Sequence, residues 1–200
     1  MFGGPGNDKI IMAVGTSTTD QQITGGTGDD IIYGVDYGYG ENIYGDLRFE
    51  VAGYGVFEEG GEDKIYGSDN LLNDQFIWGG KGNDFIMSGN NTGGDIKIYG
   101  DLDGALFGLG ATRFDTIEDG DDIIEVGNNN LSVLVGGGGG NDKIIGGWGG
   151  GQVDRLYGND GDDKIWLVNP EERMFEDNAD QNFGFGGLGD DFIYGTFGAD

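Results

Sequence analysis

Eight aspartates occupy the same position in a short repeated pattern. Each is preceded by Asn, Asp or Glu and followed two residues later by Ile, and they are Asp8, Asp30, Asp63, Asp84, Asp122, Asp142, Asp163 and Asp191. Five copies also carry a full Gly-Gly-x-Gly run, as in Gly79 to Gly82 before Asp84. Gly-rich turns can bend backbone carbonyls toward one point, and carbonyls with carboxylates suit hard cations, above all calcium.

The composition excludes most other chemistry. The 200 residues include no Cys and no His, so no disulfide framework, zinc finger or Ser–His–Asp nucleophile can form. Asp and Glu number 37 against 10 Lys and Arg, and the formal net charge of −27 repels nucleic-acid phosphates. No apolar run is long enough for a transmembrane helix. We expect no nucleic-acid partner, no membrane span and, because repetition singles out no catalytic pair, no enzyme.

The elements that must position these aspartates are short strands. Each Asp precedes a short apolar segment, and a second apolar segment, such as Phe76-Ile77-Trp78, lies between successive Asp repeats. Short segments bounded by Gly and Asx, without a 3.6-residue period, are typical of β-strands. Stacking like on like buries their apolar sides and predicts two parallel sheets. We predict eight Asp-preceded strands and seven intervening strands, the latter burying Ile23, Ile43, Ile77, Ile98, Leu134 and Leu156.

The repeat resembles a known family. Gly-Gly-x-Gly-x-Asp-x-(apolar)-x, as in Gly25 to Tyr33, is similar to the nonapeptide of the RTX, or haemolysin-type, calcium-binding proteins. The resemblance implies an all-β fold, a parallel β-roll or two-sheet β-solenoid of about seven to eight turns. It implies that the eight aspartates are calcium ligands, with the best-matched being Asp8, Asp30, Asp84, Asp142 and Asp191, followed by Asp63, Asp122 and Asp163. It also implies carbonyl ligands at Gly6, Gly28, Gly82, Gly140 and Gly189.

One departure from the family pattern predicts a calcium file along a single edge. The family repeats its motif every nine residues, whereas here only the loops that lead into the Asp-preceded strands carry it. The other loops, such as Val14 to Asp20 and Asn128 to Asn130, are irregular. We therefore expect an ordered file of cations along one edge of the roll and variable loops along the other.

An alternative role for the aspartates is to cap Gly turns as solvated side chains. Their regular occurrence before every Ile weighs against it. Strands stacked ~4.8 Å apart would align eight carboxylates along one edge, and such a file repels itself without cations. Up to about seven calcium ions, one for each gap between stacked loops, would neutralise it. Calcium is therefore expected to be part of the fold.

We expect one domain over residues 1–200, with insertions near 47–59, 102–116 and 169–181. The first two insertions follow the same tetrapeptide, Ile-Tyr-Gly-Asp, and contain several aromatic residues. They would cover a sheet face or form an interface. Outward aromatic positions such as Tyr44 and Trp78 would form cross-strand ladders, or a surface for another protomer or for sugar rings.

Three functional classes stay open, all in an extracellular or cell-surface setting where calcium is plentiful. They are a structural protein, a binding or adhesion module for polysaccharide or a cell surface, and a calcium-sensing export module of a larger secreted toxin or enzyme. Scattered Lys and Arg do not predict the basic groove that an acidic polysaccharide needs. Uncapped solenoid ends favour head-to-tail self-association into filaments, unless flanking domains supply the caps.

Overall fold

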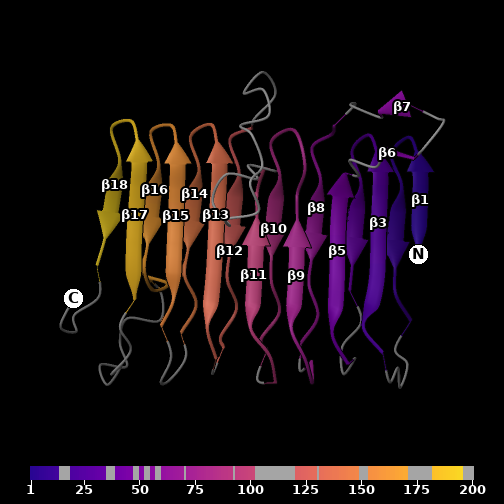
Figure 1. The fold of residues 1–200 in the computed structure, drawn as a ribbon, viewed down its shortest axis with the longest axis horizontal. Coiled ribbons are helices and arrows are strands. Elements are labelled where there is room, and N and C mark those ends of the chain that lie inside the picture. Colours follow the sequence, from indigo (N-terminus) through magenta and orange to yellow (C-terminus); the bar gives the residue numbers. More distant parts are fainter. Residues whose placement is uncertain are drawn as a thin grey trace.

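The structure of the chain is a computed structural model that describes most of the 200 residues. The described ranges are 1–13, 19–34, 39–46, 60–69, 71–91, 93–101, 120–129, 131–148, 153–170 and 182–195, together with the backbone of 50–51 and 55–56. Within these ranges the regular structure is β-strand (Figure 1). They contain no helix of the length and apolarity that a membrane crossing requires.

Two parallel eight-stranded sheets form the roll, and the chain passes from one to the other at every turn. The first sheet contains β1 (Phe2–Pro5), β3 (Gln21–Thr27), β5 (Glu41–Asp46), β9 (Gln75–Trp78), β11 (Ile96–Tyr99), β13 (Val133–Gly139), β15 (Arg155–Asp160) and β17 (Phe183–Leu188). The second contains β2 (Lys9–Ile11), β4 (Ile31–Tyr33), β8 (Lys64–Tyr66), β10 (Phe85–Met87), β12 (Ile123–Glu125), β14 (Lys143–Ile145), β16 (Lys164–Trp166) and β18 (Phe192–Tyr194). The order of strands in each sheet follows the sequence, so the predicted parallel β-roll is confirmed.

The seven intervening strands are present as predicted, and the first sheet contains one further strand that was not predicted from the sequence. The additional strand is β1, which pairs with β3 and places Gly4 opposite Gly26. Its sequence, Phe-Gly-Gly-Pro, contains no apolar triplet and reads as a loop. Stacking on β3 supplies the hydrogen-bond partners that make it a strand. The first turn of the roll therefore begins in the first sheet.

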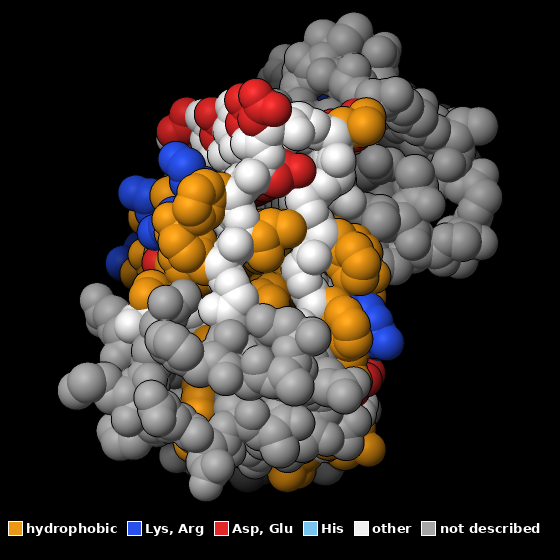
Figure 2. All heavy atoms as spheres, turned by 90° about the vertical axis from the view of Figure 1, so that its left-hand side faces the viewer, with side chains coloured by type: hydrophobic (Ala, Val, Ile, Leu, Met, Phe, Trp, Pro, Cys, Tyr) orange, Lys and Arg blue, Asp and Glu red, His pale blue; other side chains and the backbone are white. Residues whose placement is uncertain are grey.

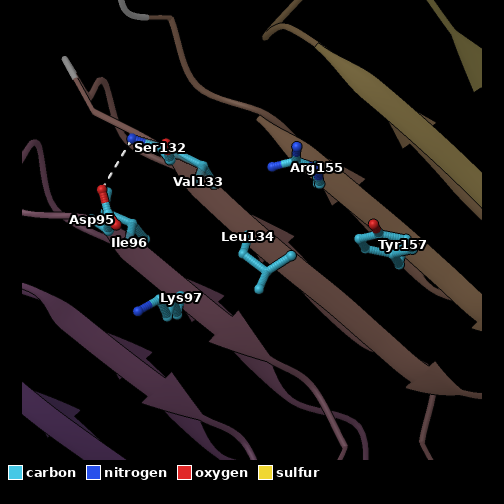
Figure 3. Close-up of a pocket in the computed structure, with 8 residues that line it drawn as sticks. All are labelled: Asp95, Ile96, Lys97, Ser132, Val133, Leu134, Arg155 and Tyr157. Carbon is cyan, nitrogen blue, oxygen red and sulfur yellow. Dashed lines mark hydrogen bonds between the residues drawn. The ribbon is translucent and has the colours of Figure 1, made fainter. Parts of the chain in front are cut away.

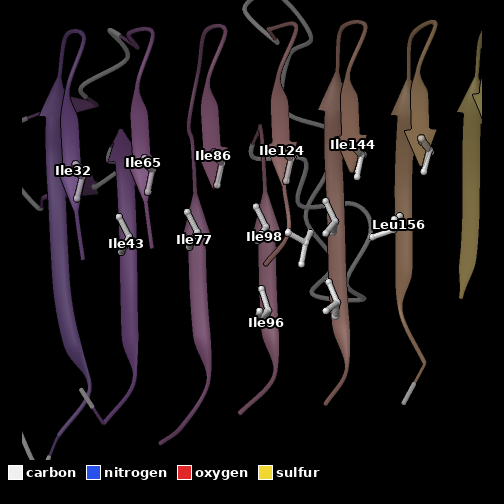
Figure 4. Packing of buried hydrophobic residues seen from close by; sticks show 14 of the residues in the cluster. Ile32, Ile43, Ile65, Ile77, Ile86, Ile96, Ile98, Ile124, Ile144 and Leu156 are labelled. Carbon is white, nitrogen blue, oxygen red and sulfur yellow. The ribbon is translucent and has the colours of Figure 1, made fainter. Parts of the chain in front are cut away.

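The core lies between the two sheets and consists mainly of Ile. The repeat register places Ile32 on Ile65 and Ile65 on Ile86, and the matching file of the first sheet faces them (Figure 4). Each fully buried Ile contributes roughly 1.5–3 kcal/mol of transfer free energy. The Ile file that follows the repeat aspartates is buried from Ile10 to Ile165.

One predicted core position is wrong. Leu134 faces outward, and Val135 takes the buried position between Ile98 and Leu156. The segment Val133-Leu134-Val135 is apolar throughout, so alternation alone cannot set its register. In the last strand of the first sheet Gly184 stands opposite Leu156, and the side chains of Leu167 and Ile193 lie where its Cβ would be.

Aromatic side chains on the outer faces form cross-strand stacks. The rings of Tyr44 and Trp78 are 4.8 Å apart and 2° from parallel, and those of Tyr33 and Tyr66 are 4.8 Å apart at 7°. Such pairs add stability beyond the area that they bury. The ladder interpretation of these residues is confirmed for the described strands.

The predicted insertions lie largely outside the described residues. Insertion 102–116 lies wholly outside them. Within 47–59 the strands β6 (Glu50–Val51) and β7 (Gly55–Val56) pair antiparallel, and of 169–181 only Asn169 and Pro170 are described. The roll itself keeps its register across all three interruptions.

Candidate metal centre

The loops that carry the repeat lie along one edge, the upper edge in Figure 1, where the chain leaves the first sheet and enters the second. In the loop between β9 and β10, Gly80 and Gly82 have φ values of 128° and 108°. Only glycine adopts such values without strain. These two glycines let the chain reverse within a few residues and place Asp84 just before β10.

The eight repeat aspartates form one continuous hydrogen-bonded file, which we call the inner ladder. In each step, Oδ1 of one repeat Asp accepts the backbone N–H of the repeat Asp in the preceding turn. The seven steps, at 2.7–3.1 Å, join Asp8, Asp30, Asp63, Asp84, Asp122, Asp142, Asp163 and Asp191 in order. The structure thus brings all predicted aspartates together, those with partial glycine sets included.

In six of the eight inner-ladder aspartates the second carboxylate oxygen is buried and makes no hydrogen bond. This holds for Oδ2 of Asp8, Asp30, Asp63, Asp84, Asp122 and Asp163. An ionised oxygen buried without a partner costs several kcal/mol. One such oxygen in nearly every turn points to a cation as its partner.

Backbone carbonyls lie beside these oxygens. A Cβ built on Gly25 would lie 2.1 Å from Oδ2 of Asp30 and 2.7 Å from the carbonyl oxygen of Gly45 in the next turn. At Gly79 the same point lies 2.1 Å from Oδ2 of Asp84 and 2.9 Å from the carbonyl of Gly100. The same pair occurs at Gly3, Gly45, Gly100 and Gly137. Six turns therefore bring a carboxylate oxygen and a carbonyl oxygen to the same side of the first glycine.

The third glycines, predicted as carbonyl ligands, form a second stack along the same edge. A Cβ on Gly82 would lie 2.2 Å from the carbonyl oxygen of Gly61, and one on Gly140 would lie 2.1 Å from that of Gly120. Gly28 stacks on Gly6, and Gly189 on Gly161, in the same way. The carbonyls of the first glycines were not predicted as ligands, although the doubled glycine of the five complete repeats was a signal.

A second file of side chains, which we call the outer ladder, runs beside the inner ladder. It consists of the residue before each repeat Asp. In six of these residues Oδ1 accepts a backbone N–H of the following turn, as Asp121 accepts from Asn141 at 2.7 Å. Outer positions are Asn7, Asp29, Glu62, Asn83, Asp121, Asn141, Asp162 and Asp190. Amides and carboxylates thus serve equally here, whereas the inner ladder contains only Asp. The restriction to Asp indicates that the inner position requires two oxygens, Oδ1 to accept the backbone N–H and a charged Oδ2.

Glu41 shows what a buried carboxylate looks like when neutral donors satisfy it. Its Oε1 accepts hydrogen bonds from Ser68 N and Gln75 Nε2, both at 2.7 Å, and its Oε2 accepts one from the Ser68 hydroxyl at 2.5 Å. Both oxygens are therefore engaged. The inner ladder differs because donors reach only Oδ1.

Burial dominates the electrostatics of the inner ladder. Burial, together with the charges of neighbouring carboxylates, raises the pKa of Asp63 to about 8 and that of Asp84 to about 10; among these carboxylates the largest effects come from Asp46 on Asp63 and from Asp122 on Asp84. Backbone N–H groups that donate to these carboxylates act in the opposite direction. A file of this kind holds its charge only when cations lie within it.

The donor set fits calcium. The described residues contain no group of three or more Asp or Glu side chains that could hold a metal by themselves. A cation on this edge must therefore take most of its ligands from backbone carbonyls, with one repeat carboxylate per turn. Calcium accepts six to eight oxygens in flexible geometry, whereas magnesium demands a small octahedral shell.

Two carboxylates of this edge were not predicted. Asp46 is the last residue of β5, and Asp101 lies two residues after the end of β11. Both are buried. They stand where complete loops have the second repeat glycine: Asp46 pairs with Gly26, and a Cβ on Gly138 would lie 2.5 Å from that of Asp101. The shared tetrapeptide Ile-Tyr-Gly-Asp was the only sequence signal.

The opposite edge carries its own side-chain hydrogen bonds. Asn90 N donates to Asp69 Oδ1 at 2.6 Å, Asn128 N to Asn90 Oδ1 at 2.8 Å, and Trp148 N to Asn128 Oδ1 at 3.0 Å. These contacts span four described loops of different sequence. The loops are irregular, as predicted, but Asx side chains still join neighbouring turns.

A shallow pocket lies on the outer face of the first sheet (Figure 3). Lys97 of β11 and Arg155 of β15 flank the shorter Leu134 of β13, and Tyr157 lines the same pocket. Asp95 lies at the rim and accepts the N–H of Ser132 at 3.2 Å. Lys97 also approaches Asp74 to 3.8 Å and lies over the ring of Phe76. Two positively charged side chains, Lys97 and Arg155, thus line one pocket of an otherwise acidic protein.

Comparison with known proteins identifies the repeat. A family model described as "RTX calcium-binding nonapeptide repeat (4 copies)" matches residues 16–34, 74–92, 137–153, 148–167 and 178–200. Neither the curated proteins nor the solved structures contain a match.

Proposed function

Because the chain belongs to the RTX calcium-binding repeat family, we propose that it is a calcium-stabilised structural roll that assembles end to end outside the cell. The inner ladder carries the calcium-stabilised part of this proposal, because it is Asp in every turn and leaves Oδ2 buried without a hydrogen bond in six turns. Sites with few carboxylates and many carbonyls suit a calcium-rich medium, since extracellular modules bind calcium at roughly 10⁻⁴–10⁻³ M.

The last described turn supports end-to-end association. Leu188, Phe192 and Ile193 are 66%, 51% and 42% exposed, although Ile193 continues the core file and stacks on the fully buried Ile165. Figure 2 views this end, where apolar side chains lie below the acidic edge. Phe2 and Ile11 of the first turn are also exposed. A parallel roll repeats by translation, so the first turn of a second copy can continue both sheets.

Sedimentation velocity over a range of protein concentrations at millimolar calcium tests the assembly. We expect concentration-dependent association that Ile193→Glu reduces at least about tenfold, because it places a charge on the apolar end. Met87→Glu, on the outer face of the second sheet, is the control and should associate as the unmodified chain does. Monomers at every concentration would overturn the end-to-end proposal and leave the calcium proposal standing.

The pocket on the first sheet favours a second candidate function, binding of an acidic polysaccharide. Lys97 and Arg155 stand two strands apart around Leu134, and aromatic residues line the neighbouring positions of this face. The positively charged side chains of Lys97 and Arg155 can bind the carboxylates of a uronic-acid chain while its sugar rings lie on Tyr157. The ion pair of Lys97 with Asp74 is long, at 3.8 Å, and partly exposed to solvent, so it competes only weakly for the ammonium group of Lys97.

Calorimetric titration with oligogalacturonate tests this candidate. The double substitution Lys97→Ala/Arg155→Ala is expected to weaken binding by about tenfold or more, because each lost charge-assisted hydrogen bond is worth roughly 1.5–3 kcal/mol. Lys64→Ala/Lys164→Ala, which removes two exposed cations of the second sheet, is the matched control. Equal losses in the two double variants would show non-specific attraction and reject the pocket as a site.

A further inference from the structure

Asp46 occupies a position that the complete loops reserve for glycine. The register places it opposite Gly26, whose φ is 134°, and a Cβ on Gly80 of the next turn would lie 2.5 Å from that of Asp46. Among the described non-glycine residues only Asn159, at the same register in β15, has positive φ. The backbone therefore leaves the usual loop path at Asp46, where the insertion 47–59 begins.

The carboxylate of Asp46 is turned into the repeat edge. Asp46 is only 8% exposed, and its Oδ2 accepts the N–H groups of Gly61 at 3.1 Å and Lys81 at 3.3 Å. It thus bridges the loop of its own turn and that of the next. Its Oδ1 is buried and has no hydrogen-bond partner. Oδ2 of Asp46 therefore accepts backbone donors from both loops, whereas Oδ1 has no donor.

The carboxylate of Asp46, with its unpartnered Oδ1, lies close to the inner ladder. Gly45, the residue before Asp46, has Oδ2 of Asp63 and the carbonyl of Gly79 at 2.1 and 2.3 Å from its Cβ position. Oδ2 of Asp84 lies 2.1 Å from the Cβ position of Gly79 in the next turn. Asp46 is close enough to Asp63 and Asp84 for its charge to raise the pKa of both carboxyls. Buried carboxylate oxygens therefore gather around one stretch of the edge.

Asp101 occupies the corresponding position at the second long insertion. It is 5% exposed, its Oδ2 accepts the N–H of Gly120 at 3.0 Å, and its Cβ lies 2.5 Å from the Cβ position of Gly138. Its charge raises the pKa of Asp122. Aspartate thus replaces the second repeat glycine in the two turns that contain the insertions 47–59 and 102–116.

We infer that Asp46 and Asp101 each supply an additional carboxylate to the cation site of the turn that an insertion interrupts. The inference rests on the proposed calcium function and deepens it. Bridging two N–H groups requires one acceptor oxygen and no charge, which an amide would provide. A charged oxygen left buried beside the inner ladder is explained by a cation. Because affinity rises with the number of charged ligands, these two sites bind calcium more tightly than the others and fill first.

Terbium titration tests the assignment, because Tb³⁺ replaces calcium and its emission is sensitised by nearby aromatic rings. Trp78 stacks on Tyr44 of β5 and directly precedes Gly79 and Gly80 beside Asp46. Asp46→Asn keeps an acceptor oxygen and removes the charge, and we expect it to weaken the Trp-sensitised Tb³⁺ site about tenfold or more. Asp29→Asn, on the exposed outer ladder, is the matched control and should leave the titration unchanged.

The outcomes separate this inference from the proposed function. An unchanged Tb³⁺ titration in a folded Asp46→Asn variant would overturn the role of Asp46. Absence of Tb³⁺ and calcium binding by the unmodified chain would overturn the calcium function itself. If Asp46→Asn does not fold at saturating calcium, calcium calorimetry of Asp101→Asn decides, with loss of the tightest class of sites supporting the assignment and an unchanged isotherm rejecting it.

Discussion

Gly79→Ala is expected to destabilise the roll by about 3 kcal/mol or more, because it overpacks a site that cannot expand. The new Cβ would lie 2.1 Å from Oδ2 and 2.8 Å from Cγ of Asp84, and 2.9 Å from the carbonyl oxygen of Gly100. Two of these atoms belong to the proposed calcium site. The substitution therefore disturbs packing and moves a ligand oxygen at the same time. Urea unfolding at saturating calcium measures the loss.

Gly4→Ala is the matched control for this prediction. The Cβ position of Gly4 meets only a ring carbon of Phe2, at an ordinary contact distance of 3.9 Å, but its φ is 119°. Alanine there pays only the cost of a left-handed backbone, roughly 1–2 kcal/mol. The apparent calcium affinity should fall in Gly79→Ala and stay near that of the unmodified chain in Gly4→Ala. Equal effects on stability and affinity would show that backbone strain, and not the crowded Asp84 site, governs both variants.

The sequence predicted the architecture because the repeat is regular. The Asp-x-Ile spacing fixes the register of the second sheet, and every described strand of that sheet follows it. Prediction failed where a strand lacked alternation. β1 reads as a Gly-Pro loop until β3 supplies its partners, and Val133-Leu134-Val135 is apolar at every position, so only pairing with Ile98 shows that Val135 is buried.

The site was predictable in part for the same reason. All eight repeat aspartates lie in one file, yet their ranking by glycine content has no counterpart in the inner ladder, which includes Asp63 and Asp122 on equal terms. The Asx residue before each repeat Asp was visible in the sequence, but its role depends on a neighbour in the next turn. Asp46 and Asp101 could not be identified as edge carboxylates from the sequence, because their burial follows from where the insertions leave the roll.

Removal of calcium is expected to have the largest effect of all. With cations in place, the buried Oδ2 atoms of the inner ladder have partners. Without them, the file must either hold unpaired buried charge or take up protons. Neither alternative supplies the ligand bonds that join adjacent loops, so folding and binding are coupled. Magnesium should restore little, since its octahedral shell suits carbonyl-rich loops poorly.

The most direct test follows the far-ultraviolet circular dichroism of the 200-residue chain during calcium titration from an EDTA-treated state. The account predicts that the β-sheet signal is lost in EDTA, returns cooperatively with calcium, and does not return at the same concentrations of magnesium. A β-sheet spectrum that is unchanged in EDTA, together with an unfolding midpoint that calcium does not shift, would contradict it.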